Sequence, residues 1–460
     1  MERSVEGKRV TVVGFGRSGT AAAKLALKKG AREVVMQDKR DAVELGDEKV
    51  LELARDGIRP ELGGHRAQTL IESDLIVVSP GVPKLEAIDA AVSKGVPVVS
   101  EVELASWFIR GEYIGITGTN GKSTVTALTG ELVKASGVPT FVGGNLGVPL
   151  SEAVGTPAAD EGGALVVELS SYQLEQTHSL RLRVAVLLNV TPDHLDRYGT
   201  LPAYAAAKQR IFLSQTKSDF AVVPAFDPLM VAMAAAGPGV VQTYGGPSGD
   251  VRLDGDSIVD RWGSRFARSL LKIRGAHNVE NAMASILAAK LLGVQDTAVR
   301  DALASFEGLP HRMQFVAEEE GISYFNDSKA TNVAASVKAL EGVEPGRRVV
   351  LIAGGRDKGG SYGPMRPLLE KKGRALVLVG EATELMKAQL EDLVPVRQAD
   401  DMFDAVRIAR GCARKGDVVL LAPACSSLDM FENYEERGRV FSAAVKALAG
   451  TSRQEEDLSS

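Results

Sequence analysis

Short β-rich apolar runs alternate with helical stretches along most of this chain of 460 residues. Such alternation is typical of α/β layers with largely parallel sheets, because a helix carries the chain from the end of one parallel strand back to the start of the next. At about 150 residues per domain, the length predicts about three domains. No repeat of fixed period is apparent. We therefore expect an α/β fold of three domains.

The composition is that of an ordinary globular protein, with 45% hydrophobic and 25% charged residues, which excludes a disordered, collagen-like or coiled-coil chain. Lys and Arg number 54 and Asp and Glu 59, so the net charge of −5 does not favour nucleic acid or a membrane as a partner. Two cysteines, Cys412 and Cys425, are too few for a disulfide framework and are expected to be reduced thiols. Because no signal-peptide pattern and no membrane-spanning apolar run occur, we expect a cytoplasmic protein.

The predicted elements fall into three groups. Residues 1–100 are predicted to form a Rossmann-like domain, with strands at 9–13, 33–38, 75–78 and 96–99 and a helix at 18–29. Residues 101–308 are predicted to form a central α/β domain, with strands at 113–117, 164–169 and 183–188, a hairpin at 250–260, and helices at 123–136, 277–292 and 296–306. Residues 309–460 are predicted to form a second Rossmann-like unit, with a hairpin at 315–324, strands at 348–353, 375–379 and 418–421, and helices at 367–372, 381–393, 402–414 and 431–448.

The strongest local signal is the run Ile114-Gly-Ile-Thr-Gly-Thr-Asn-Gly-Lys-Ser-Thr124, between a predicted strand and a predicted helix. Glycines let backbone N–H groups approach phosphate oxygens, and the helix N-terminus adds a positive dipole end. Lys122 could neutralise phosphate charge, and the Ser123 hydroxyl could bind Mg²⁺. The general phosphate-loop pattern expects glycine at position 116, where this chain has isoleucine; its loop glycine is Gly118. A plain strand–helix connection is the alternative, but the run favours binding of a nucleoside triphosphate.

A second glycine turn, Gly14-Phe-Gly16-Arg-Ser-Gly19, fits the dinucleotide fingerprint between a strand and a helix. Asp38 follows Gly19 by about 20 residues, the usual distance of a ribose-binding acid. The turn alone favours a dinucleotide or a nucleoside diphosphate, with Lys39 and Arg40 near phosphate. The alternative is a tight turn with a surface acid. Two phosphate-type loops suggest two different nucleotide ligands.

Three polar residues of the central domain are candidates for catalysis or metal binding. Glu168 ends a predicted strand, where a carboxylate is well placed to bind Mg²⁺. His194 follows Asp193 at another strand end and could contact metal or phosphate. Lys208 lies on an alanine-rich helical run, and periodicity alone favours a solvated lysine there. The alternatives are that Glu168 is a surface acid and that His194 is a structural histidine.

Two further candidates lie near the predicted start of the third domain, where joints between domains are common ligand sites. Arg312 follows Leu309-Pro-His311 and could bind phosphates through its guanidinium fork. Asp327 lies in the polar cluster Asn326–Asn332 and could accept a hydrogen bond from a ribose hydroxyl. Spacing alone establishes neither role.

The sequence resembles the Mur ligases, ATP-dependent amide-bond ligases of peptidoglycan precursor synthesis. The resemblance covers nearly the whole chain through several separated motifs. They are Gly118–Thr124, Glu168-Leu-Ser-Ser-Tyr-Gln-Leu-Glu175, Asn189-Val-Thr-Pro-Asp-His-Leu-Asp-Arg197, His277-Asn-Val-Glu-Asn281, Gly308-Leu-Pro-His-Arg312, Asn326-Asp-Ser-Lys-Ala-Thr-Asn332, Pro423-Ala-Cys-Ser-Ser-Leu-Asp-Met-Phe431 and Tyr434-Glu-Glu-Arg-Gly438. The N-terminal glycine turn, the Gly-Thr-Asn-Gly-Lys loop and the run from Ser426 make it most similar to the member that adds D-glutamate.

The resemblance implies three domains: one for a UDP-sugar, a central ATPase domain and a C-terminal domain that binds the incoming amino acid. It implies that the first glycine turn binds the uridine diphosphate end of UDP-N-acetylmuramoyl-L-alanine rather than NAD. The implied contacts are Arg17, Ser18, Asp38, Lys39, Arg40 and Gly81, with Asn145 contacting the sugar.

The resemblance also implies the other ligands. The residues implied for ATP are Gly118, Thr119, Asn120, Gly121, Lys122, Ser123, Thr124, Asn278, Asn281, Arg312 and Asp327. One Mg²⁺ is implied at Ser123 and Glu168, and a second at His194 and a CO₂-derived carbamate on Lys208. The alternative for Lys208 is an unmodified lysine that forms a salt bridge with an acid. The residues implied for D-glutamate are Lys329, Thr331, Ser427 and Tyr434, with Lys358 close by.

The implied reaction passes through an acyl phosphate and yields ADP and phosphate, with Lys122, Glu168, His194 and Lys208 as the catalytic residues. Closure of the third domain is expected to protect that intermediate from water. We expect a monomer without nucleic-acid or membrane partners. An NAD-dependent oxidoreductase would leave the Lys122 loop unexplained, and the N-terminal glycine turn argues against a folylpolyglutamate synthetase. The many polar strand-end residues disfavour a non-catalytic nucleotide switch.

Overall fold

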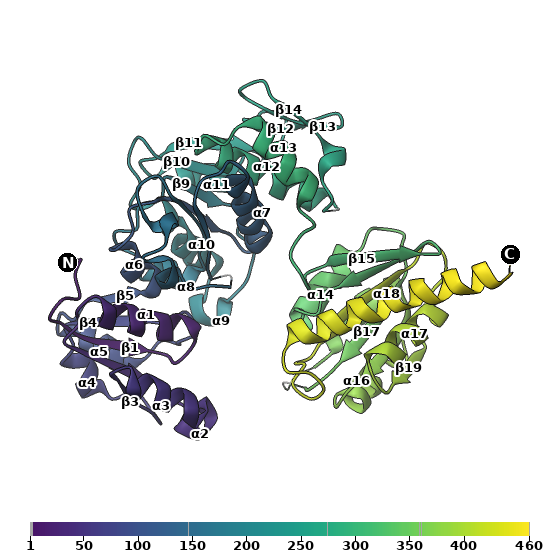
Figure 1. Ribbon diagram of the computed structural model, residues 1–460, viewed down its shortest axis with the longest axis horizontal. Coiled ribbons are helices and arrows are strands. Elements are labelled where there is room, and N and C mark those ends of the chain that lie inside the picture. The colour runs from purple at the N-terminus through teal and green to yellow at the C-terminus, as the bar shows by residue number, and fades with distance from the viewer. Residues whose placement is uncertain (1–2, 146, 274, 358, 360, 460) are drawn as a thin grey trace. The chain divides into compact units, whose positions relative to one another are not determined.

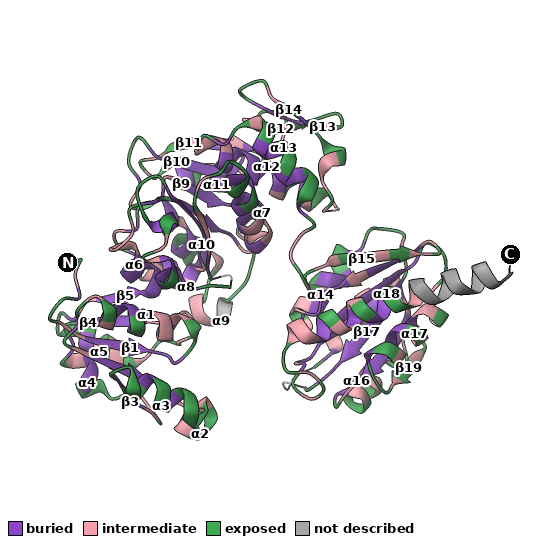
Figure 2. Ribbon diagram, viewed as in Figure 1, coloured by how far each residue is buried: buried purple, intermediate pink, exposed green. Residues whose placement is uncertain are grey.

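The computed structural model describes residues 3–145, 147–273, 275–357, 359 and 361–459. It divides into two compact units, Met1–Phe306 and Glu307–Ser460, which are described separately (Figure 1). Helices cover the sheets. In Figure 2 most strand residues are therefore purple (buried), whereas the helices carry green (exposed) residues on their outer faces. In the part of the chain that is described, no helix is long and apolar enough to cross a membrane.

The first sheet of unit 1 is fully parallel, in the order β3-β2-β1-β4-β5. The chain order reverses between β1 and β4, and ligands of such sheets bind at the carboxyl ends beside this reversal. The strands are β1 (Arg9–Val13), β2 (Glu33–Gln37), β3 (Ile58–Glu61), β4 (Leu75–Val78) and β5 (Val98–Ser100), and the helices are α1 (Arg17–Lys28), α2 (Ala42–Leu45), α3 (Asp47–Arg55), α4 (Ala67–Ile71) and α5 (Glu86–Ser93).

The second sheet has the order β14-β13-β12-β11-β10-β9-β6-β8-β7 and is parallel except at β12–β14. The predicted hairpin at Asp254-Gly255 is confirmed by the pairing of Asp254 with Ser257. The strands are β6 (Glu112–Thr117), β7 (Thr140–Gly144), β8 (Ala164–Glu168), β9 (Val184–Leu187), β10 (Phe220–Pro224), β11 (Val240–Tyr244), β12 (Val251–Asp254), β13 (Ser257–Asp260) and β14 (Arg265–Ala267). The helices are α6 (Glu101–Ser106), α7 (Lys122–Ala135), α8 (Ser171–Glu175), α9 (Leu195–Tyr198), α10 (Leu201–Gln209), α11 (Pro228–Ala235), α12 (Ala276–Leu291) and α13 (Asp296–Ser305), with short 3₁₀ turns η1 (Leu150–Ala153), η2 (Pro157–Ala159), η3 (Arg210–Phe212) and η4 (Arg268–Leu270).

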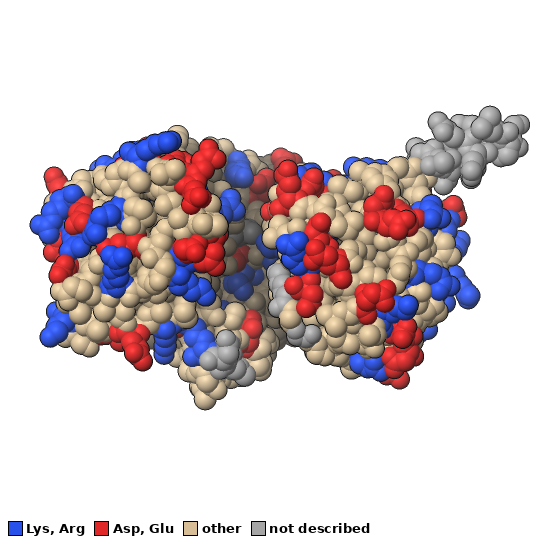
Figure 3. Space-filling model, turned by 90° about the horizontal axis from the view of Figure 1, so that it is seen from below, with Lys and Arg blue, Asp and Glu red and all other residues tan. Residues whose placement is uncertain are grey.

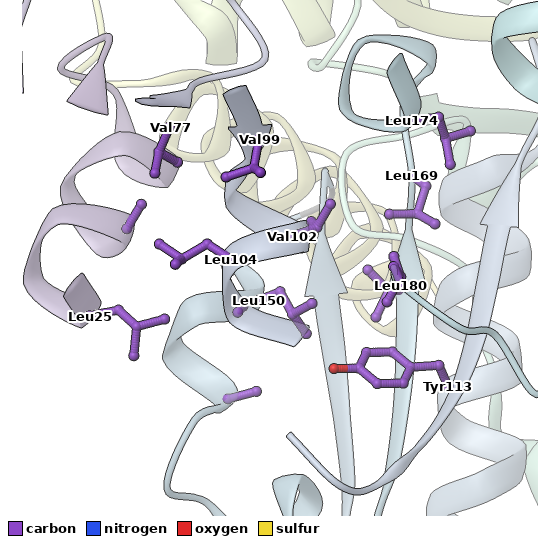
Figure 4. Packing of buried hydrophobic residues seen from close by; sticks show 14 of the residues in the cluster. Leu25, Val77, Val99, Val102, Leu104, Tyr113, Leu150, Leu169, Leu174 and Leu180 are labelled. Atoms are coloured by element: carbon purple, nitrogen blue, oxygen red, sulfur yellow. The ribbon is translucent and has the colours of Figure 1, made fainter. Parts of the chain in front are cut away.

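One hydrophobic cluster runs from the first sheet into the second (Figure 4). Leu25 of α1 and Val99 of β5 belong to the same cluster as Leu150 of η1 and Leu169, which follows β8. Helix α6 begins directly after β5 and buries Leu104 in this cluster. The predicted boundary at residue 100 therefore crosses a continuous core, and the boundary stays a prediction.

Unit 2 is built on a sheet of order β15-β16-β20-β17-β18-β19, parallel except for the β15–β16 hairpin. This hairpin turns at Glu320-Gly321, as the sequence predicted. The strands are β15 (Gln314–Glu319), β16 (Ile322–Asn326), β17 (Val349–Gly354), β18 (Gly373–Val379), β19 (Val396–Ala399) and β20 (Val418–Ala424). The helices are α14 (Val333–Gly342), α15 (Arg366–Lys372), α16 (Thr383–Leu390), α17 (Met402–Cys412) and α18 (Tyr434–Ser459), with the 3₁₀ turn η5 (Gly363–Met365).

Basic and acidic side chains are mixed over the face drawn in Figure 3. Blue and red groups alternate there rather than forming a field of one sign. This mixture agrees with the net charge of −5. The face therefore carries no basic stripe of the kind that binds nucleic acid.

Candidate active site

A glycine loop joins β6 to α7 in the second sheet. Gly118 and Gly121 have φ angles of +153° and +85°, which side chains rarely adopt. A Cβ atom at Gly121 would also lie 2.7 Å from Asn281 Oδ1. The loop therefore requires glycine at both positions, and it leads directly into Lys122, the first residue of α7. Free backbone N–H groups at such a helix start bind anions, phosphate in particular.

The loop is braced by Asn189, which follows β9. Its Oδ1 atom accepts hydrogen bonds from the backbone N–H groups of Thr119, at 3.1 Å, and Asn120, at 2.8 Å. Its Nδ2 atom donates to the Asn120 carbonyl at 3.1 Å. The sequence predicted no role for Asn189 itself, although this residue begins the motif Asn189–Arg197. Its amide shapes the loop that Lys122 closes.

Two lysines that are far apart in the sequence meet on one carbonyl oxygen. Lys122 Nζ donates to the Gly118 carbonyl at 2.9 Å and to the Thr119 carbonyl at 2.8 Å. Lys208 Nζ, from α10, donates to the same Gly118 carbonyl at 2.7 Å. Lys208 is only 1% exposed, so it is not the solvated helix lysine that periodicity favours. The structure thus brings both predicted lysines to the glycine loop.

The environment of Lys208 favours its neutral amine. Burial is the main reason that its pKa falls from 10.5 to about 7, and the positive charge of Lys122 lowers it further. The negative charges of Asp193 and Glu168 act in the opposite direction but are weaker. Among the described residues Lys208 forms no ion pair, so the structure does not show the alternative of an unmodified lysine in a salt bridge with an acid. Near neutral pH, a large share of this side chain is a nucleophilic amine.

Glu168 is the last residue of β8, the strand beside β6. Its Oε1 atom accepts a hydrogen bond from Asn145 Nδ2 at 2.8 Å. Its Oε2 atom is buried and has no hydrogen-bond partner among the residues described. Leaving a buried carboxylate oxygen unpaired is costly, and a divalent cation that prefers oxygen ligands would satisfy it. This atom therefore fits Mg²⁺.

Ser123 lies next to Lys122 in the first turn of α7 and is 5% exposed. Over the described ranges, no three His, Cys, Asp or Glu side chains form a group that could hold a metal ion. A cation at Glu168 would therefore need other oxygen ligands, such as the Ser123 hydroxyl and phosphate oxygens.

His194 adopts φ +52°, a left-handed conformation that is unusual outside glycine. Its Nδ1 atom is 2.9 Å from the Tyr172 hydroxyl, and its ring packs edge-on against Tyr204 at 6.0 Å between ring centroids. Lys208 Nζ lies 4.6 Å from the centroid of the same Tyr204 ring. The Tyr204 ring thus lies beside both His194 and Lys208.

The start of α12 lies against the glycine loop. Asn281 Oδ1 faces Gly121, and Asn281 Nδ2 donates to Asn278 Oδ1 at 3.0 Å. Both asparagines were singled out for ATP from the sequence. The structure places them together beside the turn that precedes Lys122.

A cavity of about 600 Å³ opens at the carboxyl ends of β1 and β4. The first glycine turn lines it, together with Gly144 at the end of β7 and Asn145 directly after it. All the residues expected to contact the UDP-sugar line it: Arg17, Ser18, Asp38, Lys39, Arg40, Gly81 and Asn145. His65 also lines the cavity and was missed, because nothing in its sequence neighbourhood marks it.

Asp38 is held in place by the protein itself. Its Oδ2 atom accepts from the Phe15 N–H at 2.7 Å, and the Arg40 guanidinium binds both carboxylate oxygens at 2.9 and 2.8 Å. Burial would raise the pKa of Asp38, but Arg40 and the backbone N–H groups outweigh it and hold the pKa below its ordinary value. The carboxylate therefore shapes the glycine turn as well as lining the cavity.

In unit 2, predicted residues gather at the carboxyl ends of β16 and β20. The two loops are joined by hydrogen bonds from Asp327 N to Leu421 O, at 2.8 Å, and from Ala424 N to Ala330 O, at 2.9 Å. Burial raises the pKa of Asp327 to about 6, although a hydrogen bond from the Met313 N–H and the positive charge of Arg312 both act to lower it. Lys329 and Thr331 follow β16, Ser427 follows β20, and Tyr434 begins α18. Lys358 lies outside the described residues.

Arg437 is a functional candidate that sequence reasoning missed. The residue is 2% exposed, and its guanidinium donates to Ser328 Oγ at 3.0 Å, the Ser328 carbonyl at 3.0 Å and the Cys425 carbonyl at 3.2 Å. It therefore clamps the loops after β16 and β20 from α18. Burial lowers its pKa to about 10. Its place in the motif Tyr434–Gly438 was the only signal for it in the sequence.

Family models match three parts of the chain. They are described as Mur ligase MurD-like, N-terminal domain, at residues 8–100; Mur ligase middle domain, at 116–289; and Mur ligase, glutamate ligase domain, at 311–425. The chain belongs to the Mur ligase family.

Curated relatives place the chain more closely within this family. The UDP-N-acetylmuramoylalanine–D-glutamate ligase of Geotalea daltonii is 45% identical over 453 residues, 97% of this chain and 99% of that protein. The protein of the same name from Anaeromyxobacter dehalogenans is 47% identical over 456 residues, 95% of this chain and 97% of that one. The chain is thus a MurD-like Mur ligase, as its motifs predicted.

Solved structures share the fold. The UDP-N-acetylmuramate-alanine ligase MurC of Thermotoga maritima matches with a TM-score of 0.57 at 19% identity, over 96% of this chain and 99% of that one. The MurF ligase of the same organism, in complex with ADP, matches with a TM-score of 0.54 at 19% identity, over 96% of each chain. The predicted α/β architecture of three Mur ligase domains is confirmed.

Proposed function

We propose that the chain is an ATP-dependent ligase that joins D-glutamate to UDP-N-acetylmuramoyl-L-alanine in peptidoglycan precursor synthesis, yielding ADP and phosphate. The observation that carries this proposal is the meeting of Lys122 and Lys208 on the glycine loop, in the same unit as a cavity lined by every residue expected to contact the UDP-sugar. The relatives with the corresponding name support the same substrates.

The chemistry requires activation of a carboxylate. Oxide is a poor leaving group, so an amine does not displace it at neutral pH. The alanyl carboxylate would attack the γ-phosphorus of ATP, forming a C–O–P linkage and releasing ADP. The D-glutamate amine would then attack the carbonyl carbon, lose a proton and expel inorganic phosphate, leaving an amide.

The chain contributes positioning and charge. The loop Gly118–Gly121 and the first turn of α7 would hold the phosphates through backbone N–H groups, with Thr124 in the same turn, and Lys122 would offset their charge. Mg²⁺ bound by Glu168 and Ser123 would supply charge neutralisation at the transferring phosphoryl group. Asn278 and Asn281 would contact ATP in unit 1, and Arg312 and Asp327 in unit 2.

We further propose that Lys208 is carbamylated. The neutral amine would attack CO₂, forming an N–C bond and releasing a proton, which converts a cation into an anionic oxygen donor. A pKa of about 7 supports this reaction, since the amine is substantially neutral under physiological conditions. Together with His194, the carbamate would bind a second Mg²⁺.

The amino acid would bind in unit 2. Lys329, Thr331, Ser427 and Tyr434 supply cationic and hydroxyl groups suited to carboxylates, and Lys358 is proposed with them. We propose a cytoplasmic monomer, in keeping with nucleotide substrates.

The decisive experiment combines product release with isotope transfer. Purified protein is incubated with ATP, Mg²⁺ and UDP-N-acetylmuramoyl-L-alanine labelled with ¹⁸O in the alanyl carboxylate, while the amino acid is varied among D-glutamate, L-glutamate and D-aspartate. Product formation with D-glutamate and one ¹⁸O atom in the released phosphate are expected. Unlabelled phosphate would rule out the acyl phosphate, and preference for another amino acid would overturn the assigned substrate.

A further inference from the structure

Arg197, on α9, makes three contacts that the roles assigned above do not explain. Its Nη2 atom lies 2.6 Å from Glu175 Oε2, at the end of α8. Its guanidinium carbon lies 4.4 Å from the centroid of the Tyr172 ring. Its Nη1 atom donates to the Val82 carbonyl at 3.4 Å. The Arg197 and Glu175 side chains are only 19% and 22% exposed, so this ion pair is better shielded than a surface pair.

The Tyr172 contact leads to the catalytic centre. The Tyr172 hydroxyl lies 2.9 Å from His194 Nδ1, and the two ring centroids are 5.1 Å apart. A hydrogen bond at one imidazole nitrogen sets both the orientation of the ring and the proton on the other nitrogen. The ring that Arg197 covers is therefore the ring that orients His194.

The Val82 contact leads to the first cavity. Pro80, Gly81, Val82 and Pro83 follow β4 and line the cavity assigned to the UDP-sugar. The same four residues, with Lys84, Tyr172 and Arg197, line a second cavity of about 440 Å³. The loop 80–84 thus forms a wall common to the first cavity and to the space beside Tyr172.

We propose that Arg197 is a positioning residue that couples the loop 80–84 to the imidazole of His194 through the ring and hydroxyl of Tyr172. The inference rests on the proposed function, because the loop is expected to contact the UDP-linked substrate. Arginine suits this task because its planar guanidinium stacks on a ring while its edge binds a carboxylate and a carbonyl. Lysine offers a point charge without that plane, so Arg197→Lys separates charge from geometry.

The first test follows His194 directly, without turnover. Histidine-selective NMR is recorded on the full chain, which has five histidines, and His194 is assigned by substitution. UDP alone is then added as the probe of the first cavity. The His194 ring signals are expected to shift with UDP in the wild type but not in Arg197→Lys or Tyr172→Phe. An equal shift in all three proteins would overturn the coupling.

The second test is kinetic. Tyr172→Phe removes only the hydroxyl and is expected to lower kcat by about 10- to 100-fold, with the KM for the UDP-linked substrate nearly unchanged. Arg197→Lys is expected to lower kcat and also to raise this KM, since it frees the loop as well. Because the two residues act through one another, the double variant is expected to lose much less than the product of the single losses. Multiplicative losses would contradict the relay.

Matched controls separate the relay from general destabilisation. Arg181→Lys disturbs another arginine–carboxylate contact in unit 1, to Asp219 at 2.8 Å, and Tyr113→Phe removes a buried hydroxyl that has no hydrogen-bond partner among the described residues. Both are expected to leave kcat, KM and the His194 response unchanged. If the wild type forms no product from these substrates, the proposed function fails, while the response of His194 to UDP still decides the coupling.

Discussion

At the scale of single residues, the Gly118 carbonyl organises the proposed catalytic centre. It accepts hydrogen bonds from both Lys122 and Lys208, which are remote in sequence. The loop pattern predicted Lys122, but spacing assigned Lys208 to a solvated helix face. Its burial arises because α10 packs against α8, a tertiary contact that leaves no trace in the periodicity of α10.

Removing the Lys208 side chain tests its proposed carbamate. Lys208→Ala is expected to lower ligase turnover by ~100-fold or more, because the proposed anionic metal ligand would be lost. Formate or acetate is expected to restore part of the rate by supplying a carboxylate in the space left behind. Turnover is measured as phosphate release with and without the acid.

Lys122→Ala is the matched control for this rescue. It removes a cation from the same carbonyl, so an added carboxylate should not restore its activity. Full activity of Lys208→Ala without added acid would refute the carbamate.

At the scale of elements, candidate side chains follow strand ends: Glu168 ends β8, Asn189 follows β9, and Asp327 follows β16. The sequence predicted Glu168 and Asp327 at strand ends, where ligand sites of parallel sheets are found, but it assigned no role to Asn189. It missed β3, β7, β14 and β19, which are edge strands, and also β10 and β11, which lie inside the second sheet. An edge strand is covered by a neighbour on only one side, and the mixed burial of β7 and β19 weakens the apolar pattern.

The strand-to-helix turn before α7 predicts a selective effect of Gly121→Ala. The positive φ of +85° and the 2.7 Å approach to Asn281 Oδ1 should distort the loop and weaken ATP binding at least tenfold. ATP affinity is measured by calorimetry, and folding by thermal unfolding.

Gly137→Ala is the matched control for the loop. Gly137 follows the other end of α7 with φ +83°, but a Cβ atom there meets nothing within 4 Å. We expect a similar backbone penalty of about 1–2 kcal/mol and unchanged ATP affinity. Equal ATP affinity in both variants would show that the Gly121 turn does not shape the nucleotide site.

Helix α6 predicts a pH-dependent stability. Glu101 is fully buried, and burial raises its pKa from 4.5 to about 7. Because the folded state holds this proton more tightly, its stabilising contribution is complete below pH 4.5 and is lost as the pH rises through 7. The expected loss is about 3 kcal/mol. Glu101→Gln should remove this dependence of the free energy of unfolding on pH, as measured by urea unfolding at pH 4.5, 6 and 8.

Glu103, two residues along α6, provides a control of opposite sign. Burial would raise its pKa, but hydrogen bonds from Ser179, His178 and Trp107 outweigh this effect and lower it below 4.5. Its contribution is therefore present above pH 4.5 and lost in acid. Glu103→Gln should be most destabilised at pH 8, and the same pH dependence in both variants would refute the assignment.

At the scale of the whole molecule, the five hydrophobic clusters of the described residues respect the division into two units. One cluster spans the first and second sheets, whereas two clusters belong to unit 2 alone. A core of its own is the physical requirement for independent folding.

A fragment of residues 307–460 is therefore expected to fold alone, with a cooperative thermal transition and dispersed amide signals in NMR spectra. A fragment of residues 1–100 should show no such transition, because separation exposes the side of its core that packs on the second sheet. Cooperative unfolding of the short fragment would show that the shared cluster is dispensable.

The sequence by itself determined the α/β class, the two glycine turns and the family, because these depend on local spacing and on residue types that the chemistry requires. Through the family resemblance it also named seven of the residues that line the first cavity. Tertiary structure alone decided that Lys208 is buried on the Gly118 carbonyl, that Arg437 clamps two loops, and that Arg197 joins Val82 to Tyr172. Burial and hydrogen bonding depend on neighbours from distant parts of the chain, and no local pattern records them.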